Sequence, residues 1–234
     1  MQDYEYKKVS AAGDIALQGL MTKVYMWMGL GLLTTAAVSY YAASSGQVIY
    51  FLIGRSITPF LILAVAELGI VFFLSSRIAK MSQATASALF FVYSALNGLT
   101  IAPLLLVYTG SSVASAFFST AGMFGAMSVY GTVTKRDLSG WGSFLMMGLI
   151  GLVIASVANI FFASERTSLV IAIMGVFIFT GLTAYDTFKI RAMASGVPGD
   201  DESAGKFAVL GALTLYLDFI NMFIFLLRIF GKRR

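Results

Sequence analysis

Long apolar runs separated by short polar connections dominate this chain. The runs are seven in number and cover about residues 24–43, 58–75, 84–108, 112–133, 142–162, 168–188 and 207–230. Each is close to the roughly 20 residues that an α-helix needs to cross a bilayer, whereas a transmembrane strand needs only about ten. The pattern predicts an all-α integral membrane protein built as a bundle of seven transmembrane helices. We expect residues 1–23 to form an N-terminal cytoplasmic or interfacial segment and residues 24–234 a single transmembrane domain.

Composition agrees with a membrane protein and excludes several kinds of chemistry. Hydrophobic residues make up 59% of the chain, charged residues 12%, and the mean hydropathy is +0.86. The chain has no cysteine and no histidine, which excludes thiol and imidazole catalysis and the zinc sites built from those side chains. The net charge of +5 comes from basic residues scattered between apolar runs. We therefore expect the lipid bilayer as a partner and no nucleic acid.

The distribution of basic residues predicts the orientation. Two arginines, Arg55 and Arg166, fall in connections on one side of the predicted bundle. The side that holds the N-terminus has many more: Lys7, Lys8, Lys23, Arg77, Lys80, Lys135, Arg136, Lys189, Arg191 and Lys206. Cytoplasmic connections carry the excess of lysine and arginine, so we expect a cytoplasmic N-terminus. Seven crossings would place the basic residues after Phe230 outside, and a re-entrant last helix would return them to the cytoplasm.

The last apolar run, 207–230, carries an acid near its centre. Asp218 lies about twelve residues, or roughly 18 Å of helix, beyond Lys206, which is near the middle of a hydrocarbon layer about 30 Å thick. Gly211, Thr214 and Asn221 lie three or four positions apart along the same face and form a polar stripe with it. An ionisable residue inside a membrane indicates a functional site. We expect this helix to be central in the bundle, with Thr214 and Asn221 lining a pore.

Three further charged residues lie within or at the ends of apolar runs: Glu67, Arg77 and Asp186. Arg77 follows Glu67 by ten residues, about 15 Å along a helix, and is expected at the cytoplasmic end, as is Asp186. An ion pair between Arg77 and Asp186 would act as a latch between two helices. Simpler interpretations stay open: Arg77 as a cytoplasmic anchor, Asp186 paired with Lys189, and Glu67 as a structural hydrogen-bonding group.

Asp186 is the best partner for Asp218. Two carboxyl groups within a few Å cannot both ionise cheaply, so such a pair retains one proton. In the ionised form the pair offers oxygen ligands to a hard cation such as Ca²⁺, which needs additional oxygens from water and carbonyl groups. The depths counted along the two helices differ by up to one helical turn. The pair is therefore predicted as a pH sensor, an ion gate and a transient metal site.

Two sequence stretches resemble the signature of the Bax-inhibitor family of seven-helix membrane proteins, in particular its bacterial inner-membrane branch. They are TAYDTFKI at 183–190 and GALTLYLDFINMFIFLLRIFG at 211–231. The resemblance implies a pH-sensitive calcium leak channel in which Asp186 and Asp218 sense protons and Glu67 lies along the pore. It also implies that Arg77 latches onto Asp186. Ca²⁺ would be the permeant ion, with no tightly bound cofactor.

Two other functions stay open from the sequence. Intramembrane aspartyl proteases also place two aspartates on neighbouring helices, one of them in a Tyr-Asp pair like Tyr185 and Asp186. Their second motif is Gly-x-Gly-Asp, whereas Asp218 follows Leu215, Tyr216 and Leu217, so we expect no enzyme. The other alternative is a non-conducting regulator that binds another membrane protein, for example a membrane protease.

Overall fold

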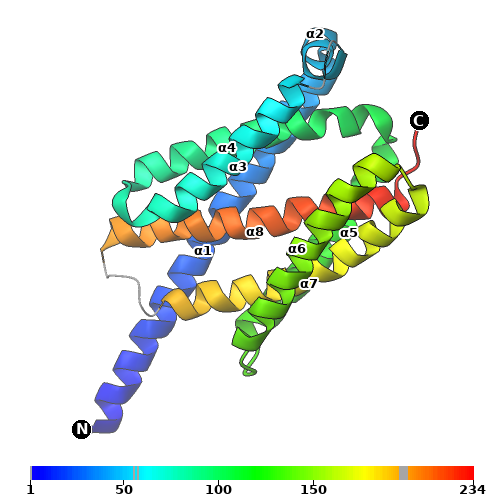
Figure 1. Ribbon diagram of the computed structural model, residues 1–234. Coiled ribbons are helices and arrows are strands. Elements are labelled where there is room, and N and C mark those ends of the chain that lie inside the picture. The colour runs from blue at the N-terminus through cyan, green and yellow to red at the C-terminus, as the bar shows by residue number, and fades with distance from the viewer. Residues whose placement is uncertain (1, 55, 57, 195–199) are drawn as a thin grey trace. The chain divides into compact units, whose positions relative to one another are not determined.

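The computed structural model describes residues 2–54, 56, 58–194 and 200–234, and Arg55 lies outside them. Eight α-helices follow one another along this part of the chain, from α1 in blue to α8 in orange and red (Figure 1). A π-helical turn, η1, and a 3₁₀ turn, η2, flank α3. In chain order the elements are α1 (Gln2–Ser44), α2 (Gly46–Ile49), η1 (Tyr50–Gly54), α3 (Thr58–Arg77), η2 (Ile78–Lys80), α4 (Gln83–Val107), α5 (Gly110–Val133), α6 (Ser139–Phe162), α7 (Glu165–Ala194) and α8 (Asp201–Phe230).

Six helices of the described residues, α3 to α8, are long and apolar enough to cross a membrane. They coincide with the second to seventh apolar runs, with α4 ending one residue before its run does, so an all-α membrane protein is confirmed. The first run, 24–43, lies in α1, which is not one of the six. A seven-helix count therefore stays a prediction.

The first helix is longer than the predicted first crossing. It continues without interruption from Gln2 through Lys23 to Ser44, so no structural boundary separates residues 1–23 from the apolar run. The physical reason is the absence of a helix breaker, since the first proline of the chain is Pro59. The assignment of residues 24–234 to a single domain stays a prediction.

The helices fall into two compact units. One comprises Met1–Leu106 and Ile190–Thr214. Within it, the rings of Trp27 on α1 and Phe91 on α4 meet edge to face at 5.6 Å. The Thr35 hydroxyl of α1 also donates a 2.8 Å hydrogen bond to the Ser94 carbonyl of α4. Aromatic packing and a buried hydrogen bond thus hold α1 against α4.

The other unit comprises Val107–Lys189 and Leu215–Arg234, and it contains both predicted sensor aspartates. Its helices approach closely where side chains are small. A Cβ atom at Gly131 of α5 would clash with the Ala184 carbonyl of α7, so only glycine permits this contact. Close helix approach at small residues is typical of packing in membranes.

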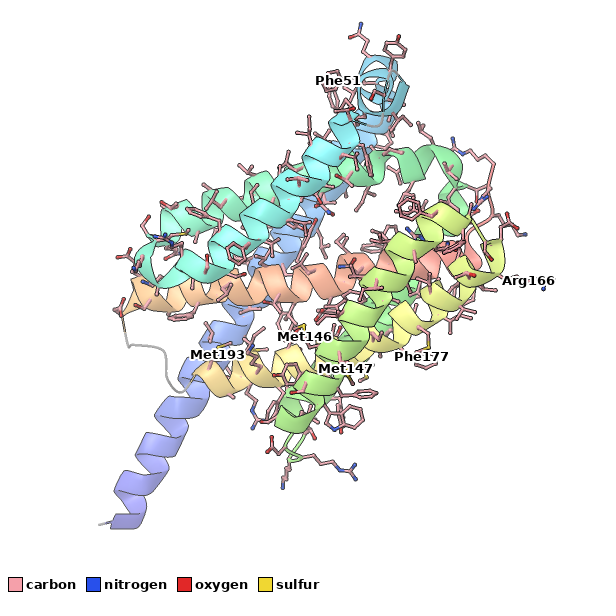
Figure 2. All side chains as sticks on the ribbon, viewed as in Figure 1. Phe51, Met146, Met147, Arg166, Phe177 and Met193 are labelled. Carbon is pink, nitrogen blue, oxygen red and sulfur yellow. The ribbon has the colours of Figure 1, made fainter. Side chains whose placement is uncertain are left out.

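Many apolar side chains of the apolar helices are exposed. In the most apolar part of each span, 11% of the residues are buried in α3 and in α6, but 72% in α8. Figure 2 labels Met146 and Met147 on α6 and Phe177 on α7, which are 52%, 66% and 71% exposed. Such a large apolar surface is stable against lipid and unfavourable in water.

The last helix is unbroken. It holds 30 residues from Asp201 to Phe230, a length of about 45 Å at 1.5 Å per residue, which exceeds a hydrocarbon layer of about 30 Å. A re-entrant segment would have to reverse direction within this stretch. The continuity of α8 therefore favours a full crossing.

Candidate functional site

Asp186 on α7 and Asp218 on α8 are in hydrogen-bonding contact through their side chains. Carboxylates only accept hydrogen bonds, so a hydrogen bond between two carboxyl groups requires one proton. Asp218 is only 3% exposed, and its Oδ2 atom has no hydrogen-bond partner among the described residues. Asp186 is half-buried. The pair thus has one deeply buried member and one nearer the surface.

Aromatic packing fixes the position of Asp218. The ring of the next residue, Phe219, meets the rings of Phe117 and Phe124 on α5 edge to face, each at 5.6 Å. Six residues beyond Phe219 on α8, Phe225 packs against Phe179 of α7 with ring centroids 6.0 Å apart. These contacts restrict the rotation of α8 about its axis, and they hold the Asp218 side chain toward α7.

The residues that follow Asp186 on α7 include a buried hydroxyl group and a cation. Its neighbour Thr187 is fully buried and lies 3.4 Å from the Ser128 hydroxyl of α5, oxygen to oxygen. Lys189, one turn further along α7, is close enough to attract the Asp186 carboxylate. No ion pair within 4.0 Å joins the two among the residues that the structure describes. Lys189 therefore acts on Asp186 through space.

The pair offers few metal ligands. No group of three or more acidic residues that could hold a metal ion occurs in the described parts of the chain. Ca²⁺ prefers six to eight oxygens, and two aspartates supply at most four. The two aspartates alone do not meet this requirement, and their role as a metal site stays a prediction.

A second polar cluster surrounds Glu67 of α3, in the other compact unit. Its Oε1 atom accepts a hydrogen bond from the Thr100 hydroxyl, and its Oε2 atom accepts one from the Asn97 amide at 3.3 Å. Asn97 is buried, whereas Glu67 and Thr100 are half-buried. The contacts with α4 satisfy both carboxylate oxygens, as a carboxylate inside apolar helices requires.

Thr214 and Asn221, predicted to line a pore, are both half-buried on α8. The Thr214 hydroxyl donates to the Leu210 carbonyl at 3.1 Å, and the Asn221 amide donates to the Leu217 carbonyl at 2.8 Å. These bonds within the helix use a donor of each side chain and leave its oxygen available as an acceptor. Their role as pore-lining residues stays a prediction.

Arg77, the predicted latch, is the exposed last residue of α3. It belongs to the first compact unit, whereas Asp186 belongs to the second. The ion pair between them stays a prediction.

Sequence reasoning missed the partners of Glu67. Asn97 and Thr100 lie three positions apart on α4, a spacing at which polar groups indicate a shared partner, and both donate to Glu67. Asp186 was predicted to pair with Asp218 although the counted depths differed by up to one turn, and the structure brings the two side chains into contact. The hydrogen bond between the Lys232 backbone amide and the Ser112 hydroxyl had no sequence signal.

Comparisons with known proteins agree with the resemblance. The family model described as "Inhibitor of apoptosis-promoting Bax1" matches residues 17–234. The chain is 51% identical over 220 residues to "Inner membrane protein YbhL" of Escherichia coli K12, covering 93% of each chain. It is 44% identical over 222 residues to "Uncharacterized protein RP147" of Rickettsia prowazekii, covering 94% of this chain and 92% of that protein. It is also 39% identical over 221 residues to an uncharacterized membrane protein of Streptococcus pyogenes serotype M1, covering 94% of this chain and 95% of that protein. Because the family model spans residues 17–234 and the Escherichia coli relative is 51% identical over nearly the whole length, the chain belongs to the Bax-inhibitor family.

Proposed function

We propose that this protein is a pH-sensitive leak channel for calcium or a similar cation. The observation that carries the proposal is the hydrogen bond between Asp186 and Asp218 within apolar helices. With one proton the pair is held together and closes the path. Loss of that proton leaves two carboxylates that repel each other, which separates α7 from α8 and exposes oxygens to a cation.

The other predicted residues have roles along this path. Glu67 on α3 and the oxygens of Thr214 and Asn221 on α8 line it, and Arg77 latches Asp186 in the closed state. The channel needs no tightly bound cofactor and is not an enzyme. Calcium and protons are its ligands, and the lipid bilayer is its surroundings.

The proposed setting is the bacterial inner membrane, because the Escherichia coli relative is named an inner membrane protein. The helix α1 supplies the seventh crossing, α8 is the central helix, and the N-terminus is cytoplasmic. The high buried share of α8 compared with the other spans supports its central position.

Calcium flux into liposomes that contain the purified protein tests the proposal. The flux is compared at about pH 6 and about pH 8 for the parent, Asp186→Asn and Asp218→Asn. We expect the parent flux to rise several-fold with pH, and the flux of both variants to be independent of pH, because asparagine does not ionise. Asp137→Asn, an exposed acid before α6, is the control and should behave like the parent.

Two outcomes would contradict the proposal of a pH-gated channel. Flux that is absent at both pH values in all four proteins would favour the non-conducting regulator of another membrane protein. Flux with unchanged pH dependence in Asp218→Asn would show that the Asp186–Asp218 pair does not control the pH response.

A further inference from the structure

The C-terminal segment 231–234 is bound to the connection between α4 and α5, which are joined through Tyr108 and Thr109. The Thr109 amide donates to the Lys232 carbonyl at 3.0 Å, and the Arg234 amide donates to the Val107 carbonyl at 2.9 Å. Tyr108 and Arg233 thereby form an isolated antiparallel bridge. In Figure 1 the red C-terminal end lies beside this connection.

A side chain and a close contact reinforce this attachment. The Lys232 amide donates to the Ser112 hydroxyl at 2.9 Å. A Cβ atom at Gly231 would clash with the Tyr108 ring and with the Leu227 carbonyl, so the chain turns here only because residue 231 is glycine. The backbone of 231–234 is thus held by specific contacts at the end of α8.

The attached segment displays a group of cations. Arg228, Lys232, Arg233 and Arg234 are all exposed. Arg228 lies over the Phe225 ring, with its guanidinium carbon 5.7 Å from the ring centroid. None of the four forms an ion pair with a carboxylate within the described ranges. We call this group the C-terminal cation cluster.

The cluster lies at the depth where lipid headgroups are expected. It begins in the last turn of α8, one of the apolar spans, and continues directly beyond it. The neighbouring Phe230 is 64% exposed, so an apolar ring is available to lipid at this end of the span. Cations at this depth attract anionic headgroups at about 1 kcal/mol each.

We propose that the C-terminal cation cluster is a binding site for the headgroup of an anionic phospholipid. Three of its four residues are presented by a backbone that is already fixed, so lipid binding does not have to order a flexible segment. The unpaired charges on the protein and the negative phosphate complement each other. This inference does not depend on channel activity.

Native mass spectrometry of the purified protein in detergent, titrated with phosphatidylglycerol, measures the apparent affinity. We expect Lys232→Gln/Arg233→Gln/Arg234→Gln to weaken it roughly 100-fold, since about 1 kcal/mol per cation corresponds to about fivefold each. The charge-matched control Lys80→Gln/Lys135→Gln/Arg136→Gln should weaken it less than about tenfold. Neutral phosphatidylcholine should bind equally to the parent and to both triple variants.

A second pair of variants tests the attachment with the charge unchanged. Ser112→Ala removes the acceptor of the Lys232 amide and should weaken phosphatidylglycerol binding several-fold, whereas Ser115→Ala, exposed on the same helix, should not. Equal affinity of the parent and the 232–234 variant would overturn the proposal, as would an unchanged affinity in Ser112→Ala. Inorganic phosphate that competes at concentrations equal to those of the lipid would identify a site for a soluble anion instead.

Discussion

Asp218 and Asp186 share a hydrogen bond but not an environment. Asp218 is 3% exposed and has one oxygen without a partner among the described residues, whereas Asp186 is half-buried. A buried polar group that loses its partner costs the full penalty of desolvation, while replacement of both partners by apolar groups can be nearly neutral. The two aspartates should therefore respond differently to truncation.

We expect Asp186→Ala to lower the free energy of unfolding by about 1–3 kcal/mol, because it removes the partner of the buried Asp218. The double variant Asp186→Ala/Asp218→Leu should recover most of this loss. Unfolding of the parent, Asp186→Ala, Asp218→Leu and the double variant in detergent micelles gives the four free energies needed for a double-mutant cycle. Additive losses in the double variant would show that the two side chains do not act as a pair.

The latch can be assigned to one of two cations. If Arg77 holds Asp186 in the closed channel, Arg77→Ala should raise basal calcium flux at about pH 6 several-fold. If Lys189 has this role, Lys189→Ala should do so instead, since Lys189 lies within the same unit as Asp186 and attracts it. Arg136→Ala, an exposed cation between α5 and α6, is the control. Unchanged flux in both test variants would leave Asp186 without a cationic latch.

The hydrogen bonds that Glu67 accepts from α4 should contribute to the free energy of unfolding. Thr100→Val preserves the shape of the side chain but removes the hydroxyl that donates to Glu67, so we expect a loss of about 1–3 kcal/mol. Thr100→Ser keeps the hydroxyl and should cost less. In the Glu67→Gln background the effect of Thr100→Val should shrink, because a neutral amide needs the donor less than a carboxylate does. An effect of equal size in both backgrounds would contradict the coupling.

The helices could be predicted from the sequence, because the length and hydropathy of an apolar run are almost sufficient to identify a transmembrane helix. The six apolar runs from 58–75 to 207–230 fall on α3 to α8 with small differences at the ends. The polar ends of helices were less predictable. The helix α8 begins at Asp201, six residues before its apolar run, because polar residues continue a helix into the interface.

The relative depth of Asp186 and Asp218 was not predictable from residue counts either. Both helices extend six residues beyond their apolar runs, α7 to Ala194 and α8 from Asp201, so the helix ends leave the counted offset unchanged. The tilt and axial shift of two helices decide which residues meet, and a count along each helix does not encode them. The partners of Glu67 depend on the rotation of α3 and α4 about their axes, which uniformly apolar runs do not encode. Side-chain pairing between helices therefore required the structure.

Ala163 ends α6 in an unfavourable backbone conformation. Its φ of 47° and ψ of 35° lie in the left-handed region, which costs a residue with a Cβ about 1–2 kcal/mol. Ala163→Gly should therefore raise the free energy of unfolding by about 1 kcal/mol, since glycine is the preferred residue at this helix end. Ala126→Gly, exposed within α5, should lower it by about 0.5–1 kcal/mol. A loss of stability in Ala163→Gly would contradict the assigned cap.

Asp200 caps the N-terminus of α8, and its effect should depend on pH. Its Oδ2 atom accepts a hydrogen bond from the Ser203 amide at 2.8 Å. This bond, and then the bond from the Ser203 hydroxyl, lower the pKa of Asp200 below its usual value of 3.8. A carboxyl group whose pKa is lower in the folded state stabilises the fold fully above the unfolded-state pKa, and this contribution is lost as the pH falls through the folded-state pKa.

Asp200→Ala should therefore lower the midpoint temperature of unfolding at pH 7 by a few degrees, as expected for loss of a helix cap. The difference from the parent should shrink as the pH falls below about 4, where the unfolded-state carboxyl is protonated. Asp200→Asn keeps an acceptor for the Ser203 amide, so its midpoint should lie between those of the parent and the alanine variant and vary less with pH. A difference between the parent and Asp200→Ala that stays constant from pH 7 to about pH 3 would show that the ionised cap does not stabilise α8.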